Sequence, residues 1–132
     1  MGQTVLVVFG DSTTAPRQVN GRNLPVYADH LRREFGKGGL VVVNAGVGGN
    51  DTVMARARFE KDVLSHKPEM AAVQFGINDS AINVWNNETE PRVSVDVFEQ
   101  NMRFYVSQLG DKGCDVILMT PNPGLRSEYS SR

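Results

Sequence analysis

Histidine and cysteine are scarce in this chain, and their scarcity excludes several kinds of site. Two of the 132 residues are histidine, His30 and His66, and one is cysteine, Cys114. A single cysteine excludes an intramolecular disulfide and any zinc site made of several thiolates. The two histidines share no short metal-ligand spacing, so the sequence predicts no metal centre. Cys114 precedes an apolar run, and we expect it to be a buried structural thiol.

An excess of charge of one sign is missing as well. Fourteen lysines and arginines are balanced by 15 aspartates and glutamates, which gives a formal net charge of −1 at pH 7. This balance is not typical of proteins that bind nucleic acid or an anionic membrane surface. The apolar run Val5–Phe9 is too short for a membrane span or for the core of a signal peptide. The compartment stays open: cytoplasmic, or exported with a signal already removed.

Apolar runs alternate with segments of helical periodicity along the whole chain. The runs cover residues 4–9, 40–44, 70–75 and 115–120. The segments between them predict helices over residues 25–35, 52–66 and 94–110. Ser94 is the predicted N-cap of the last helix and Gly110 its C-terminal stop. Residues 80–93, rich in Asn, Glu and Pro, predict a loop beside the third strand.

This alternation of strands and helices over short connections indicates an α/β fold around a parallel sheet. No linker, repeat or low-complexity stretch divides the chain, so residues 1–132 are predicted to form a single domain. A chain of this length is also long enough to bury a substantial core.

Small and polar residues follow each of the first three runs. The first run ends in Gly10-Asp11-Ser12, the second in "NAGVGGND" (44–51) and the third in "GINDS" (76–80). Because the carboxyl ends of parallel strands share one edge of the sheet, Ser12, Gly49 and Asn78 could meet in one small site. A hydroxyl, a glycine N–H open to close approach and a side-chain amide are what acyl transfer needs.

Each of these features also has an ordinary structural explanation. A serine after a strand is usually a helix or turn cap, and glycines there are mostly turn residues. The glycine cluster does not fit a dinucleotide-binding loop, because Asp51 stands where the third glycine belongs. The three features together, each at its own strand end, are much more specific than any one alone.

The three blocks resemble those of the SGNH (GDSL-type) esterases and acyl hydrolases, a family named for Ser, Gly, Asn and His in four sequence blocks. The resemblance implies that Ser12 is the nucleophile and that Gly49 and Asn78 belong to the oxyanion hole. It also implies a flavodoxin-like, doubly wound parallel sheet in the order 2-1-3-4-5, with strands 2-1-3-4 in this chain. Family members act on small-molecule or carbohydrate esters and need no cofactor, and the Ser-Thr-Thr continuation is similar to that of carbohydrate acetylesterases.

The family's fourth block, Asp-x-x-His, has no match in this sequence. His30 falls in the first predicted helix and His66 at the end of the second, where a solvated position is expected. The fourth strand is predicted to end near Thr120, and the remaining residues are too few for a further strand-helix-strand unit, which needs about 30. We therefore expect a sheet incomplete at the C-terminus and a chain that is inactive alone. We also expect it to self-associate, or to bind a severed C-terminal piece, through the exposed fourth strand.

Two other functions stay open at the level of the sequence. The chain could be a binding module that keeps the oxyanion pocket but lacks a general base, without which a serine hydroxyl is a poor nucleophile. It could also be a receiver-like phosphoacceptor, since that fold places acids at strand ends and a threonine, here Thr120, at the fourth. A receiver domain has a pair of acidic residues after its first strand, whereas Asp11 is a single acidic residue at that place.

Overall fold

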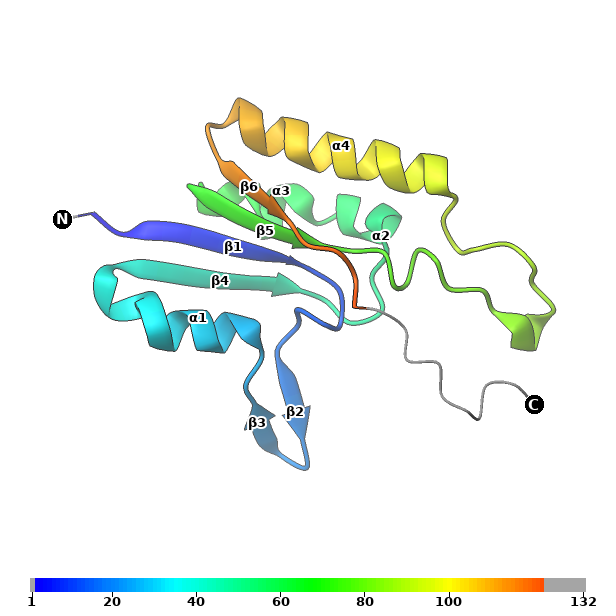
Figure 1. Ribbon diagram of the computed structural model, residues 1–132, viewed down its shortest axis with the longest axis horizontal. Helices are drawn as coiled ribbons and strands as arrows, with labels where there is room; N and C mark the ends of the chain where they lie inside the picture. Colours follow the sequence, from blue (N-terminus) through cyan, green and yellow to red (C-terminus); the bar gives the residue numbers. More distant parts are fainter. Residues whose placement is uncertain (1, 123–132) are drawn as a thin grey trace.

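The computed structural model describes residues 2–122, whose four long strands form a parallel sheet in the order β4-β1-β5-β6 (Figure 1). These strands are β1 (Thr4–Gly10), β4 (Leu40–Gly46), β5 (Met70–Gln74) and β6 (Asp115–Leu118). Counted along the chain, this is the predicted 2-1-3-4 order of a flavodoxin-like sheet. The direction of the crossovers reverses beside β1, and ligands of such sheets bind at the carboxyl ends of the strands next to the reversal.

Helices cover both faces of the sheet, as a doubly wound fold requires. Helix α1 (Tyr27–Phe35) packs on one face, and α2 (Thr52–Arg56), α3 (Phe59–Asp62) and α4 (Val95–Asp111) pack on the other (Figure 1). The side chains of β1 therefore alternate between two cores. Val7 and Phe9 point toward α2–α4, while Leu6 and Val8 point toward α1. This explains why the strand is apolar at every one of these positions.

An aromatic cluster fills the core directly below the carboxyl end of β1. The Phe9 ring lies 5.6 Å from Phe59, 4.9 Å from Phe75 and 5.2 Å from Tyr105, measured between ring centroids. Rings at these distances and in tilted or edge-on orientations pack favourably. This packing of Phe9 against three aromatic rings holds the carboxyl end of β1 in place.

Helix α4 begins where the sequence predicts, and the Ser94 side chain accepts a hydrogen bond from the Val97 N–H at 3.2 Å. The prediction that Gly110 ends this helix is wrong, because the helix continues through Asp111. The left-handed residue that ends it is Gly113, with φ = +73°. Glycine adopts this conformation without the strain that a Cβ would add.

The predicted helix over residues 52–66 is also wrong, since it forms three short pieces. These pieces are α2, α3 and the 3₁₀ turn η2 (Leu64–His66). The first interruption is at Arg58, which has φ = −113° and ψ = 0°, and the second is at Val63. Helix α1 starts two residues later than predicted and continues through Gly36 into the 3₁₀ turn η1 (Gly36–Gly38).

A short hairpin was not predicted. It consists of β2 (Arg17–Val19) and β3 (Arg22–Leu24), which pair antiparallel outside the main sheet. Its turn is Asn20-Gly21, with φ values of +50° and +74°, as a two-residue type I′ turn needs. The dipeptide Asn20-Gly21 is the feature of the sequence that could have predicted this hairpin. The predicted loop over residues 80–93 is irregular apart from the 3₁₀ turn η3 (Val84–Asn86).

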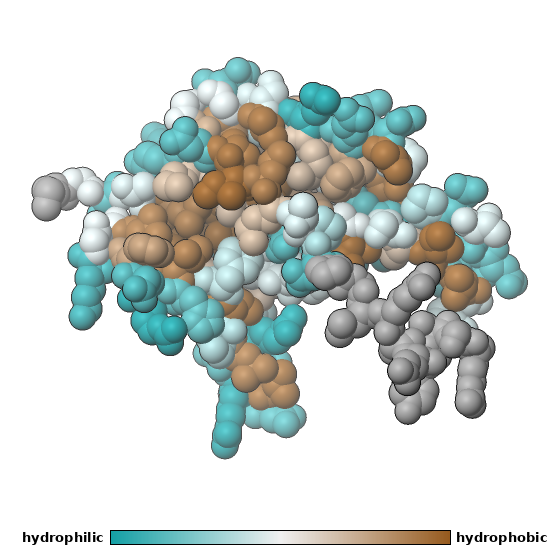
Figure 2. All heavy atoms as spheres, in the orientation of Figure 1, coloured by the Kyte–Doolittle hydropathy of each residue, from teal (hydrophilic) through white to brown (hydrophobic). Residues whose placement is uncertain are grey.

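Strand β6 lies at one edge of the sheet and is poorly covered. Its Ile117 and Leu118 side chains are 47% and 56% exposed. Figure 2 shows apolar side chains gathered over β6 and on either side of it, toward α1 and toward α4. Across residues 2–122, no helix has the length and apolar character needed to cross a bilayer.

Candidate active site

The segment after β1 is a tight turn organised by Asp11, not by Ser12. The buried Asp11 carboxylate accepts hydrogen bonds from the N–H and the hydroxyl of Thr13, at 2.9 and 2.8 Å. Its backbone carbonyl accepts from the N–H groups of Thr14 and Ala15, at 3.1 and 2.9 Å. Ser12 is exposed, and its hydroxyl makes no hydrogen bond to any of residues 2–122. Ser12 is therefore not a cap in this structure.

Two glycines at the strand ends leave room for this turn. A Cβ on Gly10 would lie 2.4 Å from the Thr14 hydroxyl oxygen, and one on Gly46 would lie 2.3 Å from the Ala15 nitrogen. Both distances are far inside van der Waals contact. The turn folds back so closely over β1 and β4 that only glycine fits beneath it.

The loop after β4 is hydrogen-bonded to the Ser12 turn. The Val47 N–H donates to the Gly10 carbonyl at 3.0 Å, and the Asn44 side-chain amide donates to the Thr14 carbonyl at 2.8 Å. A Cβ added to Gly48 would lie 3.9 Å from the Cβ of Ser12, so the two loops pass close to each other. The next residue, Gly49, is exposed and has φ = +77°.

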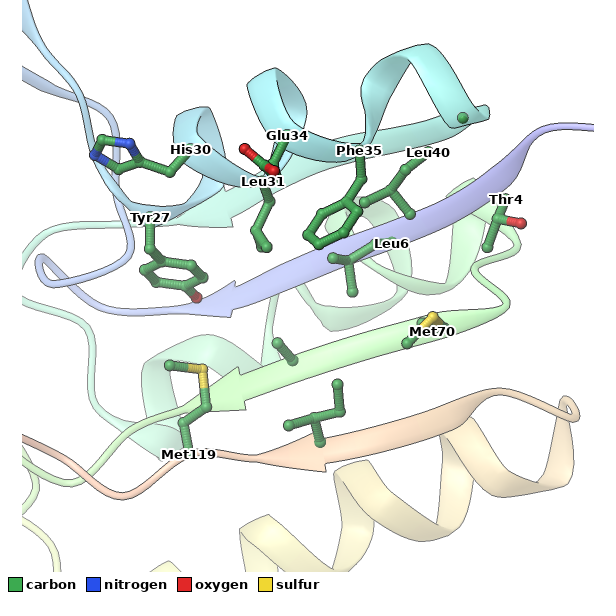
Figure 3. Close-up of a pocket in the computed structure, with 13 residues that line it drawn as sticks. Thr4, Leu6, Tyr27, His30, Leu31, Glu34, Phe35, Leu40, Met70 and Met119 are labelled. Carbon is green, nitrogen blue, oxygen red and sulfur yellow. The ribbon is translucent and has the colours of Figure 1, made fainter.

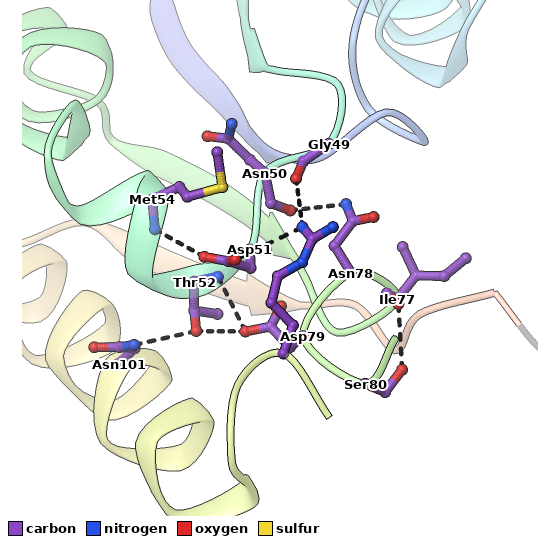
Figure 4. Close-up of polar contacts among 11 residues, drawn as sticks. Gly49, Asn50, Asp51, Thr52, Met54, Ile77, Asn78, Asp79, Ser80 and Asn101 are labelled. Carbon is purple, nitrogen blue, oxygen red and sulfur yellow. Dashed lines mark hydrogen bonds and ion pairs between the residues drawn. The ribbon is translucent and has the colours of Figure 1, made fainter. Parts of the chain in front are cut away.

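The loop after β5 joins the same edge through Asn78 (Figure 4). The Asn78 side-chain amide donates to the Asn50 backbone carbonyl at 2.8 Å. Arg92, from the far end of the long loop, donates to the Gly49 carbonyl at 3.0 Å and lies 3.7 Å from the Asp51 carboxylate. The structure thus brings together the three segments that contain Ser12, Gly49 and Asn78.

A buried polar network lies behind Asn78 and fixes the start of α2 (Figure 4). One oxygen of the Asp79 carboxylate accepts from the N–H and the hydroxyl of Thr52, at 3.0 and 2.5 Å. The other oxygen is buried without a partner among the described residues. Asn101 donates to the Thr52 hydroxyl at 3.1 Å, and Tyr105 donates to the Thr52 carbonyl at 2.5 Å. The Asp51 side chain caps α2 by accepting from the Met54 N–H.

Burial raises the pKa of three groups among residues 2–122, one of them in this network. It raises the pKa of the Tyr105 phenol well above its ordinary value, with only partial opposition from Arg56 and Arg58. It also raises the pKa of Tyr27, whose hydroxyl lies 3.1 Å from that of Thr14. Cys114 is buried as predicted, and burial raises the pKa of its thiol, which keeps it protonated and unreactive.

Neither histidine lies in the three loops. His30 is exposed on α1, and its Nδ1 accepts from Arg33 at 2.9 Å. His66 is exposed, as predicted, on the turn that leads into the amino end of β5, at the opposite edge of the sheet from Asn78. Within residues 2–122, no cluster of three or more His, Cys, Asp or Glu side chains is placed to hold a metal ion. Trp85 is 93% exposed on the long loop.

A hollow in the surface lies apart from these loops. It is a groove of about 780 Å³ on the face of the sheet beside α1, with Leu6, Phe35 and Met70 among its walls and His30 at its rim (Figure 3). Most of its lining side chains are apolar, with Thr4, His30 and Glu34 as polar exceptions, and none of Ser12, Gly49 and Asn78 lines it. The groove is an uncovered part of the hydrophobic core.

Comparison with known proteins places the chain among hydrolases. The model of the GDSL-like lipase/acylhydrolase family matches residues 8–132. An uncharacterized lipoprotein of Bacillus subtilis (strain 168), YqeF, is 36% identical over 124 residues, which are 92% of this chain and 50% of that protein. An acetylxylan esterase of Geobacillus stearothermophilus is 35% identical over 88 residues, which are 63% of this chain and 38% of the esterase.

Solved structures agree with the sequence comparisons. A lipase/acylhydrolase from Enterococcus faecalis superimposes with a TM-score of 0.74 at 29% identity, covering 92% of this chain and 58% of that one. A catalytic mutant of the Geobacillus esterase gives a TM-score of 0.72 at 27% identity, covering 92% and 61%. This chain spans about half the length of the lipoprotein and less than two thirds of these solved chains. With its parallel sheet and the match over residues 8–132, the chain belongs to the GDSL-like lipase/acylhydrolase family.

Proposed function

We propose that Ser12 is the nucleophile of a serine ester hydrolase, with Gly49 and Asn78 as donors to the oxyanion. The observation that carries this proposal is the joining of three strand ends at one edge of the sheet. Asn78 is bonded to the loop that holds Gly49, and that loop is bonded through Val47 to Gly10, at the start of the Ser12 turn. Ser12 stands in that junction with an exposed hydroxyl that has no structural hydrogen bond to the described residues.

The geometry of the donors supports this assignment. A side-chain amide has two N–H donors, and Asn78 uses one of them on the Asn50 carbonyl, which leaves the second for a substrate oxygen. The N–H groups of Ser12 and Gly49 make no hydrogen bond to any backbone group of residues 2–122. Donors fixed in advance at the position of the developing negative charge stabilise a tetrahedral intermediate.

The reaction proceeds in two stages. The Ser12 oxygen attacks the ester carbonyl carbon, the carbonyl oxygen gains the negative charge, and the alcohol leaves with a proton. Water then attacks the acyl-serine and releases the acid. Both stages need a general base to accept a proton from the attacking oxygen. We assign no base within residues 2–122, because His30 is bonded to Arg33 and His66 lies at the opposite edge of the sheet.

The relatives support both the chemistry and the substrate class. Three solved mutants of the Geobacillus acetylxylan esterase are described as catalytic, and they replace a serine, an aspartate and a histidine by alanine. We propose that the native protein takes its base and orienting acid from an equivalent pair outside the described residues. Its proposed substrates are small acyl esters, in particular acetyl groups on carbohydrate.

Labelling with a fluorophosphonate probe tests the nucleophile. The native protein should react with the probe, and Ser12→Ala should abolish the reaction. Ser80→Ala is the matched control, because Ser80 is an exposed serine on the neighbouring loop and, among the described residues, its hydroxyl bonds only to the Ile77 carbonyl. Labelling that persists in Ser12→Ala and disappears in Ser80→Ala would place the nucleophile elsewhere.

Hydrolysis of an aryl acetate tests the donor and the base. In the native protein, Asn78→Ala should lower kcat by about 10²–10³-fold, the usual loss of one oxyanion donor. The 132-residue chain alone should be no faster than its Ser12→Ala variant, because no histidine lies beside Ser12 among residues 2–122. Turnover by this chain that disappears in His30→Ala would instead make His30 the base.

A further inference from the structure

Arg58 lies between α2 and α3, and its side chain points toward the edge of the sheet that carries the candidate active site. The side chain is only 15% exposed. Its guanidinium carbon lies 4.9 Å from the centroid of the Phe9 ring. A charged group buried to this degree has to be paired and hydrogen-bonded, since an unpaired one would be strongly destabilising.

The partners of Arg58 are the ends of two strands and one loop. Its Nη2 donates to the Gly10 carbonyl at 3.0 Å, and its Nη1 donates to the Ala45 carbonyl at 2.7 Å. Its Nε donates to the Asn50 side-chain oxygen at 2.7 Å. The Asp62 carboxylate, 3.3 Å from Nη1, supplies the opposite charge.

Three of these partners lead to the proposed site residues. Gly10 is the last residue of β1 and precedes the turn that presents Ser12, and Ala45 lies one residue before the end of β4, ahead of the loop that presents Gly49. Asn50 lies in that same loop and accepts a hydrogen bond from the Asn78 side chain through its backbone carbonyl, at 2.8 Å. One guanidinium therefore binds the carboxyl ends of β1 and β4 and the loop after β4, and it reaches the loop after β5 only through Asn50.

We propose that Arg58 is a positioning residue that sets the distances between Ser12, Gly49 and Asn78; the roles of those three residues rest on the proposed function. The planar fork of arginine reaches three acceptors in fixed directions at once. Lysine has the same charge but a single nitrogen, so it cannot hold both carbonyls and the Asn50 oxygen. The interaction is therefore specific to arginine and does not depend on charge alone.

NMR spectroscopy of the ¹⁵N-labelled 132-residue chain tests this proposal without any hydrolysis. Arg58→Lys should shift the side-chain amide signals of Asn78 and the backbone amide signal of Gly49. Arg56→Lys is the matched control, because Arg56 contacts Asn101 and the Phe104 ring but no strand end. An Arg58→Lys chain that is folded and leaves these signals unchanged would overturn the proposal.

Chemical rescue of the NMR signals is a second measurement, and no rescue is expected if Arg58 only stabilises the fold. In Arg58→Ala, free guanidinium at non-denaturing concentration should restore the Asn78 and Gly49 signals, whereas methylammonium should not. If both Arg58 variants fail to fold, Asn50→Ala decides, since it removes only the acceptor of Nε. Altered Asn78 side-chain signals in that variant support the proposal, and unaltered ones contradict it.

Kinetics of the native protein complete the test. Arg58→Lys should lower kcat by up to about 10²-fold, the effect expected of a small misplacement of reacting groups, with little change in KM. If the native protein proves to have no esterase activity, the proposed function fails, and the NMR result still decides whether Arg58 positions the three loops. A rise in KM with kcat unchanged would mean that Arg58 acts on substrate binding instead.

Discussion

At the scale of single residues, the strand ends are built from glycine because the following turn leaves no space for a side chain. Gly46→Ala places a methyl group against the Ala15 backbone, which cannot move away as a flexible side chain could. We expect it to destabilise the fold by about 1–3 kcal/mol, the usual cost of overpacking, and to displace the Ser12 turn.

Urea unfolding of Gly46→Ala beside Gly36→Ala measures this effect. Gly36 has φ = −61° and no atom within 4 Å of an added Cβ, so its substitution should be neutral or stabilising by about 0.4–1 kcal/mol. Equal midpoints for the two variants would show that the turn can relax away from β4.

Tyr105 couples the stability of the fold to alkaline pH. Burial raises the pKa of its phenol, so above pH 10 the unfolded chain loses this proton while the folded chain keeps it. Stability should therefore fall as the pH rises above the ordinary value of 10.0. Tyr105→Phe removes this dependence, and at pH 7 it should cost about 1–3 kcal/mol because it leaves the buried Thr52 carbonyl without its donor.

Urea unfolding at pH 7 and pH 10.5 checks this expectation. Tyr27 is present in both proteins and also has a raised pKa, so the wild-type chain should lose more stability than Tyr105→Phe but the variant should still lose some. A variant that loses as much as the wild type between the two pH values would rule out Tyr105 as a contributor.

At the scale of helices and strands, the sequence predicts the features that depend on neighbouring residues. It misses the features that depend on residues far away in the chain. The four strands and the Ser94 cap follow from local apolar runs and capping chemistry. The interruption at Arg58 does not, because the carbonyl that its Nη2 binds is 48 residues away, at Gly10. The candidate site divides in the same way. Ser12, Gly49 and Asn78 stand out as strand-end residues, whereas no local spacing indicates Arg58.

The end of α4 offers a paired test of how a helix stops. Gly110 lies inside the helix, and a Cβ added there would have free space around it. Gly110→Ala should therefore stabilise the chain by about 0.5–1 kcal/mol. Gly113 has φ = +73°, so Gly113→Ala should destabilise it by about 1–2 kcal/mol. Thermal unfolding of both variants measures the difference. The opposite order would mean that Gly110 ends the helix in solution.

At the scale of the whole molecule, the exposed edge strand β6 determines how the 132-residue chain behaves at high concentration. Among residues 2–122, one side of β6 has no strand paired with it, and this edge together with the exposed Ile117 and Leu118 forms a template on which a second copy can pair. We expect association at micromolar concentration. Ile117→Lys should suppress it, because a charged side chain would face the partner.

Light scattering across a concentration series measures this association. Val19→Lys is the control, since Val19 is 48% exposed on the hairpin strand β2, outside the main sheet. A wild-type chain that stays monomeric throughout, or a Val19→Lys variant that suppresses association as strongly as Ile117→Lys, would contradict pairing through this edge.

The central place of β1 in the sheet has a consequence for biosynthesis. This strand leaves the ribosome before both of its neighbours, β4 and β5, which come much later in the chain. At about 5–20 residues per second, the 64 residues from Gly10 to Gln74 take roughly 3 to 13 s to translate. Until β4 has been made, an extended stretch of valine, leucine and phenylalanine has no strand to pair with, and one of its edges stays unpaired until β5 follows. The same strand that gives the finished protein its most buried core is therefore the segment that a chaperone has most reason to hold while the protein is being made.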